Sequence, residues 1–422
     1  MQKTRKNRLW LGAFGVLLGL RVLSGCASSA PERPSTRAVS AVTPTLAPIV
    51  AANNDFTWSL YGALASPSAG QPAPGNLFFS PFGIYTGLGM TYAGAAGDTA
   101  AEIRAVLGIQ SDDATFHTAL GALALDLNGE HEGRDYQLYV ANDSFIADGY
   151  PILRTFLDEL NRAYRVVPQS VPFALDPDTA RRSINGWVST QTQDTLPELF
   201  PDGAFDDGQT RLVLANAVYF EADWASGFDP AQTAAAPFHA AGGDVSVQTM
   251  TQTNTFSLTE DADTSALELD YRDDELSMLI LVPSAVDGLG ALEGRLNQSY
   301  VDGLLAQSSP EKIELRMPRF DLRTRVSLAA VLSTLGMPSA FDPVRADFSA
   351  TTGTRDLFLA DVAHAAYVQV EERGTVAAAA TGVVLQTRSG VRELSVDHPF
   401  VFLIRDKLTG AVLFAGRVTD PE

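Results

Sequence analysis

The sequence predicts an α+β fold with several antiparallel sheets, and two kinds of segment carry this prediction. Residues 55–64 and 82–93 have apolar side chains at helical spacing, and the second segment has Gly and Ala where a buried helix needs close neighbours. Segments rich in aromatic and β-branched residues, typical of strands, occur at 138–146, 211–220, 276–282 and 312–317. Because the two kinds of segment are interleaved irregularly, they do not fit a doubly wound parallel sheet.

The charge of the chain argues against a nucleic-acid-binding protein. The 422 residues include 50 acidic and 30 basic side chains, which give a formal net charge of -20. Such a surface repels nucleic acid and anionic lipid and favours solubility. With 45% hydrophobic and 19% charged residues, the chain has an ordinary globular balance and enough apolar material for a large core.

The N-terminus has the organisation of a signal peptide, which we assign to residues 1–25. A basic cluster precedes an apolar run from Leu9 to Leu20, which is too short for a stable membrane span. The Leu-Ser-Gly-Cys that ends at Cys26 resembles the lipobox of bacterial lipoproteins. This resemblance implies a lipid on Cys26 that tethers the protein to a membrane outside the cytoplasm, at the cell surface or in the periplasm. An ordinary secreted protein with an incidental Cys is the alternative.

The rest of the chain divides into a linker and one large domain. Residues 27 to about 50 are rich in Ala, Ser, Pro and Thr, which is typical of a flexible spacer, so we assign 26–50 to the anchor and its linker. The remaining sequence has no second linker of this kind and no internal repeat, which predicts one domain over 51–422. Because Cys26 is the only Cys, no internal disulfide can form and the core alone must stabilise this domain.

A segment near the C-terminus carries most of the functional information. Residues 367–370 alternate as a half-buried strand does, and 371–374 interrupt the pattern. Residues 375–381 are mostly small, and 382–395 are polar and branched, before a core strand resumes at 399–404. Four consecutive Ala favour a helix on composition alone, but this run has no capped apolar face. An exposed loop of about twenty residues is rare in a compact domain and is usually functional.

The small-residue run is also suited to become a strand. In an extended conformation Thr375, Ala377, Ala379 and Thr381 share one face. All four side chains are small. The segment could therefore slide between two existing strands without steric conflict.

Stretches along nearly the whole domain resemble the serpin family. EERGTVAAAATGVVL at 371–385 resembles the proximal hinge and reactive loop of inhibitory serpins, and NLFFSPFGIYTGLGMTYAGAAGDT at 76–99 resembles the family helix that begins N-x-F-S-P and ends G-A-x-G-x-T. Further matches follow in family order: INGWVSTQT, LANAVYFEADW, LSMLILVPS, LRMPRF, LGMPSAF, ADFSA and HPFVFLIRDKLTGAVLFAGRV. Together they cover roughly residues 51 to 421, and so many ordered matches leave little room for coincidence.

The resemblance implies a fold of three β-sheets with eight or nine helices and an exposed reactive-centre loop. It also implies a suicide inhibitor of serine proteases rather than an enzyme, acting as a monomer without a cofactor or metal. In this family a protease attacks the loop and forms an acyl-enzyme, and the freed loop then inserts as a new strand in the central sheet. The protease is carried away and distorted, so deacylation fails. The intact inhibitor is then a kinetic trap.

The resemblance places the reactive bond at Arg388-Ser389. Counting forward from Gly374 and back from Pro399 gives the same bond, with no gap required. Arg388 before the cut implies a trypsin-like serine protease as partner, because a buried guanidinium needs a carboxylate in the enzyme's pocket. Arg392 is a rival bait four residues later. A cut there would lengthen the inserted strand and hold the enzyme loosely, so we expect substrate-like cleavage at that bond.

The hinge of the loop also carries over from the family. Its residues are Gly374, Thr375, Ala377 and Ala379, each of which must be small to enter the sheet. Val376 replaces the usual Glu. Its side chain should point outward after insertion, so the replacement affects surface charge more than mechanism.

Serpins control the opening of the central sheet through a buried polar cluster, and the matching residues here are Ser80, Asn216 and His364. Gly83 replaces a second Ser of the family pattern. Trp224 matches the Trp beneath the site where the loop first enters the sheet. Without the resemblance, His364 and Trp224 would be an ordinary core histidine and an ordinary core aromatic residue.

Two other functional classes compete with an inhibitor. An enzyme is disfavoured because the sequence has no GxSxG, HExxH or CxxC motif and its five His residues are scattered. A non-inhibitory serpin, acting as a binding or chaperone-like protein, is the closer alternative. Such proteins usually carry bulky, charged or Pro residues in the hinge, which this sequence lacks.

Overall fold

The computed structural model describes residues 46–66, 75–128, 134–205, 208–272, 274–375 and 391–422. The predicted signal peptide, Cys26 and Arg388-Ser389 lie outside these residues, as do Ala377 and Ala379. Among the helices of the described residues, none has the length and apolar character needed to cross a membrane.

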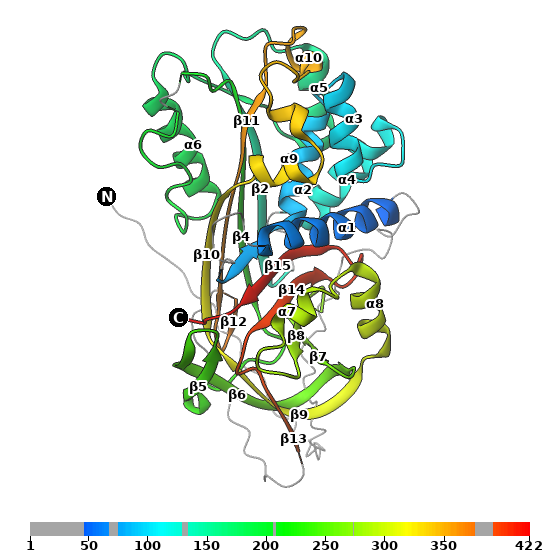
Figure 1. Cartoon of the computed structure of the whole chain (residues 1–422), viewed down its shortest axis with the longest axis vertical. Helices are drawn as coiled ribbons and strands as arrows, with labels where there is room; N and C mark the ends of the chain where they lie inside the picture. The colour runs from blue at the N-terminus through cyan, green and yellow to red at the C-terminus, as the bar shows by residue number, and fades with distance from the viewer. Residues whose placement is uncertain (1–45, 67–74, 129–133, 206–207, 273, 376–390) are drawn as a thin grey trace, which may run out of the picture. The chain divides into compact units, whose positions relative to one another are not determined.

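Helices and strands are interleaved irregularly along the chain (Figure 1). The helices are α1 (Leu46–Ala65), α2 (Pro81–Tyr92), α3 (Gly97–Val106), α4 (Asp113–Leu127), α5 (Arg154–Tyr164), α6 (Pro177–Gln191), α7 (Leu289–Glu293), α8 (Gln298–Gln307), α9 (Ala329–Leu335) and α10 (Ser349–Thr352). The strands are β1 (Leu77–Phe79), β2 (Tyr136–Ala147), β3 (Gln169–Val171), β4 (Leu212–Asp223), β5 (Ala234–Ala240), β6 (Gly243–Glu260), β7 (Thr264–Asp270), β8 (Leu276–Pro283), β9 (Ser309–Pro318), β10 (Phe320–Ser327), β11 (Leu359–Val370), β12 (Gly374–Thr375), β13 (Arg392–Ser395), β14 (Phe400–Asp406) and β15 (Val412–Val418).

The central sheet has six strands in the order β10-β11-β12-β4-β2-β3. Strands β4 and β11 run parallel and pair directly, from Leu212 opposite Leu359 to Val218 opposite Ala366. The short strand β12 lies between them beyond that point and is antiparallel to both. The central sheet is therefore closed along most of its length and parted at one end.

The second sheet has nine strands, eight of them in the order β1-β15-β14-β8-β7-β6-β9-β13, with β5 paired to β6. The α+β class is confirmed. The described residues form two hydrogen-bonded sheets rather than three, because β6 runs for 18 residues and joins β5 and β9 to β7. They contain ten α-helices rather than eight or nine, and two of these, α7 and α10, have only 5 and 4 residues.

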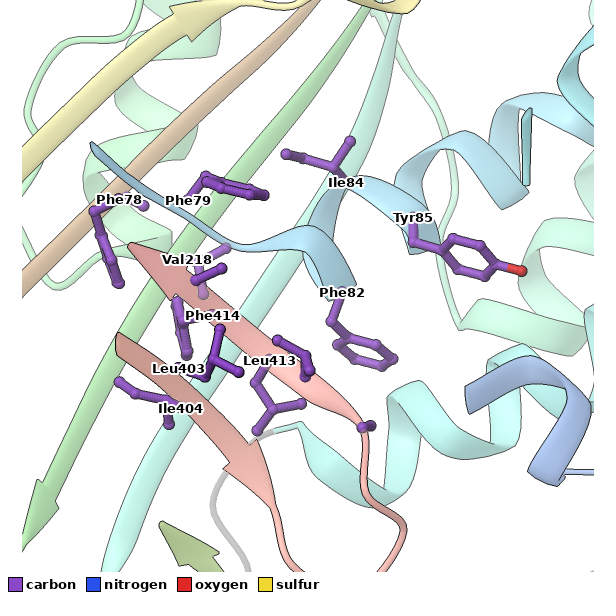
Figure 2. Packing of buried hydrophobic residues seen from close by; sticks show 14 of the residues in the cluster. Phe78, Phe79, Phe82, Ile84, Tyr85, Val218, Leu403, Ile404, Leu413 and Phe414 are labelled. Carbon is purple, nitrogen blue, oxygen red and sulfur yellow. The ribbon is translucent and has the colours of Figure 1, made fainter. Parts of the chain in front are cut away.

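Helix α2 forms the middle of the hydrophobic core. It begins after Ser80, whose side chain accepts a hydrogen bond from the backbone N–H of Gly83. All 12 of its residues are buried, as expected for a helix that is apolar on every side. In β1, just before the helix, the ring of Phe78 lies 5.3 Å from that of Phe414 (Figure 2). The Phe78 ring also lies 5.9 Å from that of Phe402. These contacts hold β1, the strand that leads into α2, against β14 and β15 of the second sheet.

The other face of the central sheet is covered by α6 (Figure 1). Val213, Ala215 and Ala363 form a buried cluster with Ile184 and Val188 of the helix. Because strand side chains alternate between the two faces, the residues between them point toward α2. The small Ala side chains let α6 lie close to β4 and β11.

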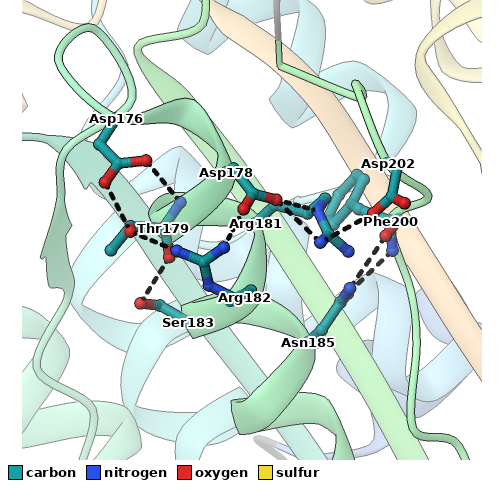
Figure 3. Close-up of polar contacts among 9 residues, drawn as sticks. All are labelled: Asp176, Asp178, Thr179, Arg181, Arg182, Ser183, Asn185, Phe200 and Asp202. Carbon is teal, nitrogen blue, oxygen red and sulfur yellow. Dashed lines mark hydrogen bonds and ion pairs between the residues drawn. The ribbon is translucent and has the colours of Figure 1, made fainter.

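The segment that follows α6, residues 192–205, is called the strap here and is tied to the helix by Asn185 (Figure 3). The Nδ2 of Asn185 donates to the Phe200 carbonyl at 2.9 Å, and its Oδ1 accepts from the N–H groups of Leu199 and Phe200, both at 2.9 Å. Arg181 adds an ion pair to Asp202 at 2.8 Å. The buried Asn185 thus replaces water as the partner of strap peptide groups, so that α6 and the strap form one cover over the sheet.

Candidate loop-insertion site

The parted end of the central sheet holds β12, the first part of the predicted hinge. Gly374 and Thr375 pair with β4, and Thr375 also lies opposite Val370 of β11. A Cβ atom on Gly374 would lie 2.0 Å from the carbonyl oxygen of Ala222, so only glycine fits this position. The Thr375 side chain is fully buried. The structure therefore places the start of the loop as a strand bonded on both sides.

An aromatic pair lies beneath β12. The rings of Trp224 and Tyr271 are stacked with centroids 4.5 Å apart and planes at 12°. The Tyr271 hydroxyl contacts the Thr375 hydroxyl at 2.9 Å, and Trp224 donates from Nε1 to the Glu371 carbonyl at 3.0 Å and from its backbone N–H to the Arg373 carbonyl at 2.7 Å. Burial raises the pKa of Tyr271, although its bond to Thr375 acts in the opposite direction. Trp224 thus lies at the hinge, as the family pattern implies.

A buried carboxylate ties the turn before β12 to the rest of the sheet. Glu372 accepts hydrogen bonds from the Arg319 guanidinium, with Nε at 2.9 Å, and from the Thr233 hydroxyl. Burial acts to raise the pKa of Glu372, but these hydrogen bonds outweigh it and the pKa lies below its ordinary value. The carbonyl of Glu372 also accepts from the Phe228 N–H at 2.7 Å. The turn is therefore held by its backbone and by a charged side chain.

A second ion pair lies on the β4 side of the same turn. Arg373 Nε lies 2.6 Å from Asp223 Oδ1, and the second carboxylate oxygen of Asp223 lies 3.2 Å from Arg272. The Arg373 side chain is 41% exposed, so the pair contributes about 1 kcal/mol or less. This pair supplements the buried contacts of Glu372.

Farther along the sheet, a hydrogen bond between His364 and Asn216 joins β11 to β4, and we call this pair the latch. The two residues lie opposite each other, with His364 Nδ1 at 2.6 Å from Asn216 Oδ1. The backbone N–H of Ser80 donates to His364 Nε2 at 3.2 Å. Since Nε2 accepts, the ring proton is on Nδ1 and is donated to Asn216. The structure thus brings together all three residues of the predicted polar cluster.

Burial determines the charge of the latch histidine. His364 is fully buried, and desolvation lowers its pKa from 6.5 to about 3. The ring is therefore neutral near pH 7 and acts as a hydrogen-bonding group.

In the part of the chain that the structure describes, no group of three or more His, Cys, Asp or Glu side chains could hold a metal ion.

The latch continues into a third strand through Asn142 of β2. Asn216 Nδ2 donates to Asn142 Oδ1 at 3.0 Å, so that hydrogen bonds connect β11, β4 and β2. Gly83 provides the space for this arrangement, because a Cβ atom there would lie 2.8 Å from Asn216 Nδ2 and 3.1 Å from Ser80 Oγ. The Ser80 hydroxyl donates instead to the carbonyl of Leu413 at 2.8 Å. Gly83, which replaces the second Ser of the family pattern, therefore leaves room for the Asn216 side chain to pack closely against it.

Sequence reasoning missed four residues of this site: Asn142, Tyr271, Arg319 and Glu372. Asn142 has a local signal, because it is a polar residue inside the strand-like segment 138–146. Arg319 and Tyr271 have none, since each lies at a strand end and reaches the hinge only through the pairing of strands distant in sequence.

A cavity of about 560 Å³ lies between the strap and the far end of β4 and β11. Its apolar lining includes Leu199, Phe205 and Val213. Its polar lining includes Asp361, whose pKa is raised by burial and whose carboxylate accepts a hydrogen bond from Ser327 at 2.7 Å. The cover over the sheet thus leaves unfilled space at the end opposite β12.

Comparison with known proteins gives one consistent family. The family model Serpin (serine protease inhibitor) matches residues 51–421. An uncharacterized serpin-like protein of Thermococcus kodakarensis is 36% identical over 380 residues, covering 89% of this chain and 86% of that protein. Leukocyte elastase inhibitor of Homo sapiens is 34% identical, covering 88% of this chain and 98% of that protein.

Solved structures show the same fold. Uncleaved ovalbumin superposes with a TM-score of 0.80 at 28% identity, covering 88% of this chain and 100% of that chain. A complex of thyroxine-binding globulin with thyroxine gives a TM-score of 0.80 at 27% identity, with 88% and 99% covered. Serpin48 of the insect Tenebrio molitor gives 0.76 at 30% identity, with 88% and 97% covered.

The burial of His364 predicts a pH dependence of stability. Its pKa is lower in the folded state than its ordinary value of 6.5, so the unfolded chain binds more protons between pH 6.5 and about pH 3. The stability of the wild type relative to His364→Gln should therefore be greatest above pH 6.5 and fall as the pH is lowered, in denaturant unfolding at several pH values.

His239→Gln is the control, because the hydrogen bond to Asp244 raises the pKa of the exposed His239 and so acts with the opposite sign. An identical pH dependence for wild type and His364→Gln would contradict the assignment of a neutral, buried His364.

Proposed function

The chain belongs to the serpin family, and we propose that it is an inhibitory member that traps trypsin-like serine proteases after cleavage at Arg388-Ser389. Serpins are in general protease inhibitors and not enzymes. The observation that carries the proposal is β12, which already lies between β4 and β11 with both neighbours hydrogen-bonded. Insertion of a cut loop would lengthen this strand into the rest of the sheet.

The register of β12 supports the proposal, because it brings one loop residue to the latch. Thr375 lies opposite Ala222 and Val370. Six residues farther along the loop is Thr381, six residues back from Ala222 is Asn216, and six residues back from Val370 is His364. An even number of steps keeps the side chains on one face of a strand. Both neighbouring strands therefore predict that inserted Thr381 lies between the two latch residues.

Thr381 can replace the hydrogen-bond partners that the two latch residues would lose on insertion. Insertion separates His364 from Asn216, and each buried polar group left without a partner costs about 1 to 3 kcal/mol. A threonine hydroxyl can accept a hydrogen bond from His364 Nδ1 and donate one to Asn216 Oδ1. The inserted loop would thus restore both partners.

The same register explains why the hinge residues must be small. Ala377 would lie opposite Phe220, and Ala379 opposite Val218, on the face that packs against the core. Phe220 and Val218 are both about 1% exposed, so little space remains between neighbouring side chains. Larger hinge residues would conflict with this core.

The far end of the sheet matches the position of the reactive bond. In the extended register Leu385 would lie opposite Leu212, the first residue of β4, so Arg388 would pass the end of the sheet. Val384 would lie opposite Val213 and point to the α6 face, where the cavity under the strap has space for it. A protease bound through Arg388 would therefore be carried along the whole strand.

The chemistry begins with the protease. Its serine attacks the carbonyl carbon of Arg388, the bond to Ser389 breaks, and an acyl-enzyme forms. New sheet hydrogen bonds at roughly 0.5 to 1.5 kcal/mol for about a dozen residues contribute on the order of 10 kcal/mol. This gain is comparable with the stability of a whole domain, so insertion is strongly favourable once the loop is cut. Inhibition further requires insertion to be faster than deacylation.

A non-inhibitory serpin is the second candidate, because the solved structures that superpose on this chain include thyroxine-binding globulin bound to thyroxine as well as uncleaved ovalbumin. Their similarity concerns the fold as a whole. The argument for inhibition is local, since it depends on the glycine and small residues of the hinge and on the register of β12.

Location is a separate part of the proposal. The signal peptide at 1–25 and the lipobox-like sequence ending at Cys26 support a lipid-anchored protein outside the cytoplasm. The acidic surface supports a basic protein partner and disfavours nucleic acid. A mature N-terminus at a residue other than Cys26, found by mass spectrometry, would remove the anchor from the proposal.

Inhibition predicts a covalent complex. Incubation of the wild-type protein with trypsin should give a band on a denaturing gel with the combined mass of the protease and the inhibitor chain up to Arg388. Arg388→Ala should abolish this complex, whereas Arg154→Ala, which removes an exposed arginine on α5, should not. Thr375→Arg should be cut without forming a complex, because a charged side chain cannot occupy the buried Thr375 position. Cleavage of the wild type with no complex at all would favour the non-inhibitory alternative.

The register predicts a specific role for the Thr381 hydroxyl. Thr381→Val keeps the side-chain shape but removes the hydroxyl, so it should lower the stability of the loop-cleaved protein by about 1 to 3 kcal/mol. The intact protein should change much less, and Thr381→Ser should restore most of the loss. Denaturant unfolding of the intact and cleaved forms measures both effects. Equal stability of cleaved wild type and cleaved Thr381→Val would show that Thr381 does not reach the latch.

A further inference from the structure

The C-terminal end of the reactive loop is fixed to the edge of the second sheet by β13. Residues Arg392–Ser395 pair in parallel with β9, from Arg392 opposite Ile313 to Ser395 opposite Arg316. The next backbone N–H, of Val396, donates to the Arg316 carbonyl at 2.8 Å. Leu394 is 8% exposed. The peptide bond after Arg392 is thus part of a paired strand.

The Arg392 side chain is also engaged. Its Nη1 lies 3.4 Å from Glu311 Oε1 on β9, and its Nη2 bonds to Glu260 Oε1 at the end of β6. The side chains of Arg392, Glu260 and Glu311 are 41%, 36% and 42% exposed. Two carboxylates on two different strands therefore hold one guanidinium against the surface of the sheet.

We propose that Glu260 and Glu311 withhold Arg392 from proteases, so that a trypsin-like enzyme acts at Arg388 rather than at Arg392. This inference rests on the proposed trypsin-like specificity. Such an enzyme needs an arginine that can leave its own protein and enter the acidic pocket, with the flanking backbone extended in the active site. Arg392 can meet this need only after β13 detaches from β9 and both ion pairs break.

The arrangement has a direct consequence for inhibition. A cut after Arg392 would add four residues to the inserted strand and leave the enzyme loosely held, which turns an inhibitor into a substrate. The sequence alone suggests that a protease could also cut after Arg392 without being trapped, because Arg388 and Arg392 lie close together. The two glutamates select between them, and they act as specificity-determining residues although neither lies in the loop.

The test uses an Arg388→Ala background, in which Arg392 is the arginine nearest to the altered position. Trypsin should cut this variant slowly after Arg392, and the released C-terminal fragment can be quantified by mass spectrometry. Adding Glu260→Gln and Glu311→Gln should raise the rate roughly threefold for each lost ion pair. Asp158→Asn with Glu159→Gln is the matched control, because it removes two carboxylates that pair with exposed arginines of α5. This control should leave the rate unchanged.

Two results would overturn the inference: an unchanged rate when both glutamates are replaced, or cleavage of Arg388→Ala after Arg392 as fast as the wild type is cut after Arg388. The outcome is separable from that of the proposed function. If the wild type forms no covalent complex but replacing the glutamates still exposes Arg392, the inhibitory proposal fails and the protection of Arg392 stands.

Discussion

The hydrogen bond between His364 and Asn216 is the interaction on which the rest of the site depends, because it keeps β4 and β11 paired below β12. At the end of the sheet that holds β12, the same two strands are already parted by Gly374 and Thr375. The central sheet is thus open at one end and closed over the rest of its length. Its neutral, fully buried histidine cannot leave Asn216 without another partner, so the closed part resists opening until a suitable strand enters.

This arrangement relates the fold to the proposed activity. A strand that enters from β12 would gain hydrogen bonds along both neighbours and would bring Thr381 to the latch as the replacement partner. The intact loop is restrained at its far end by β13 and the ion pairs of Arg392. Under the proposed function, the folded protein is a kinetic trap that is released by a cut between the two attachments. The reactive bond proposed at Arg388-Ser389 lies between β12 and β13. The position of the cut therefore matters as much as the chemistry of cleavage.

The parts of the site that could be predicted are those with a local signal. Gly374 and the alternating small residues after it are visible as a pattern, and Ser80, Asn216, His364 and Trp224 follow from the resemblance to the family. Tyr271 and Arg319 could not be predicted, because only the pairing of distant strands brings them to the hinge. Asn142 depends on the register of β2 against β4, where a slip of one residue would turn it to the other face. The α+β class was predictable, whereas the joining of two expected sheets by the long β6 was not.

Metastability is the central claim, and thermal unfolding before and after a single cut at Arg388-Ser389 tests it most directly. If the cut loop inserts, the cleaved protein must melt at a substantially higher temperature than the intact protein, although its chain has been broken. Melting of both forms at the same temperature, or of the cleaved form at a lower one, would contradict the account.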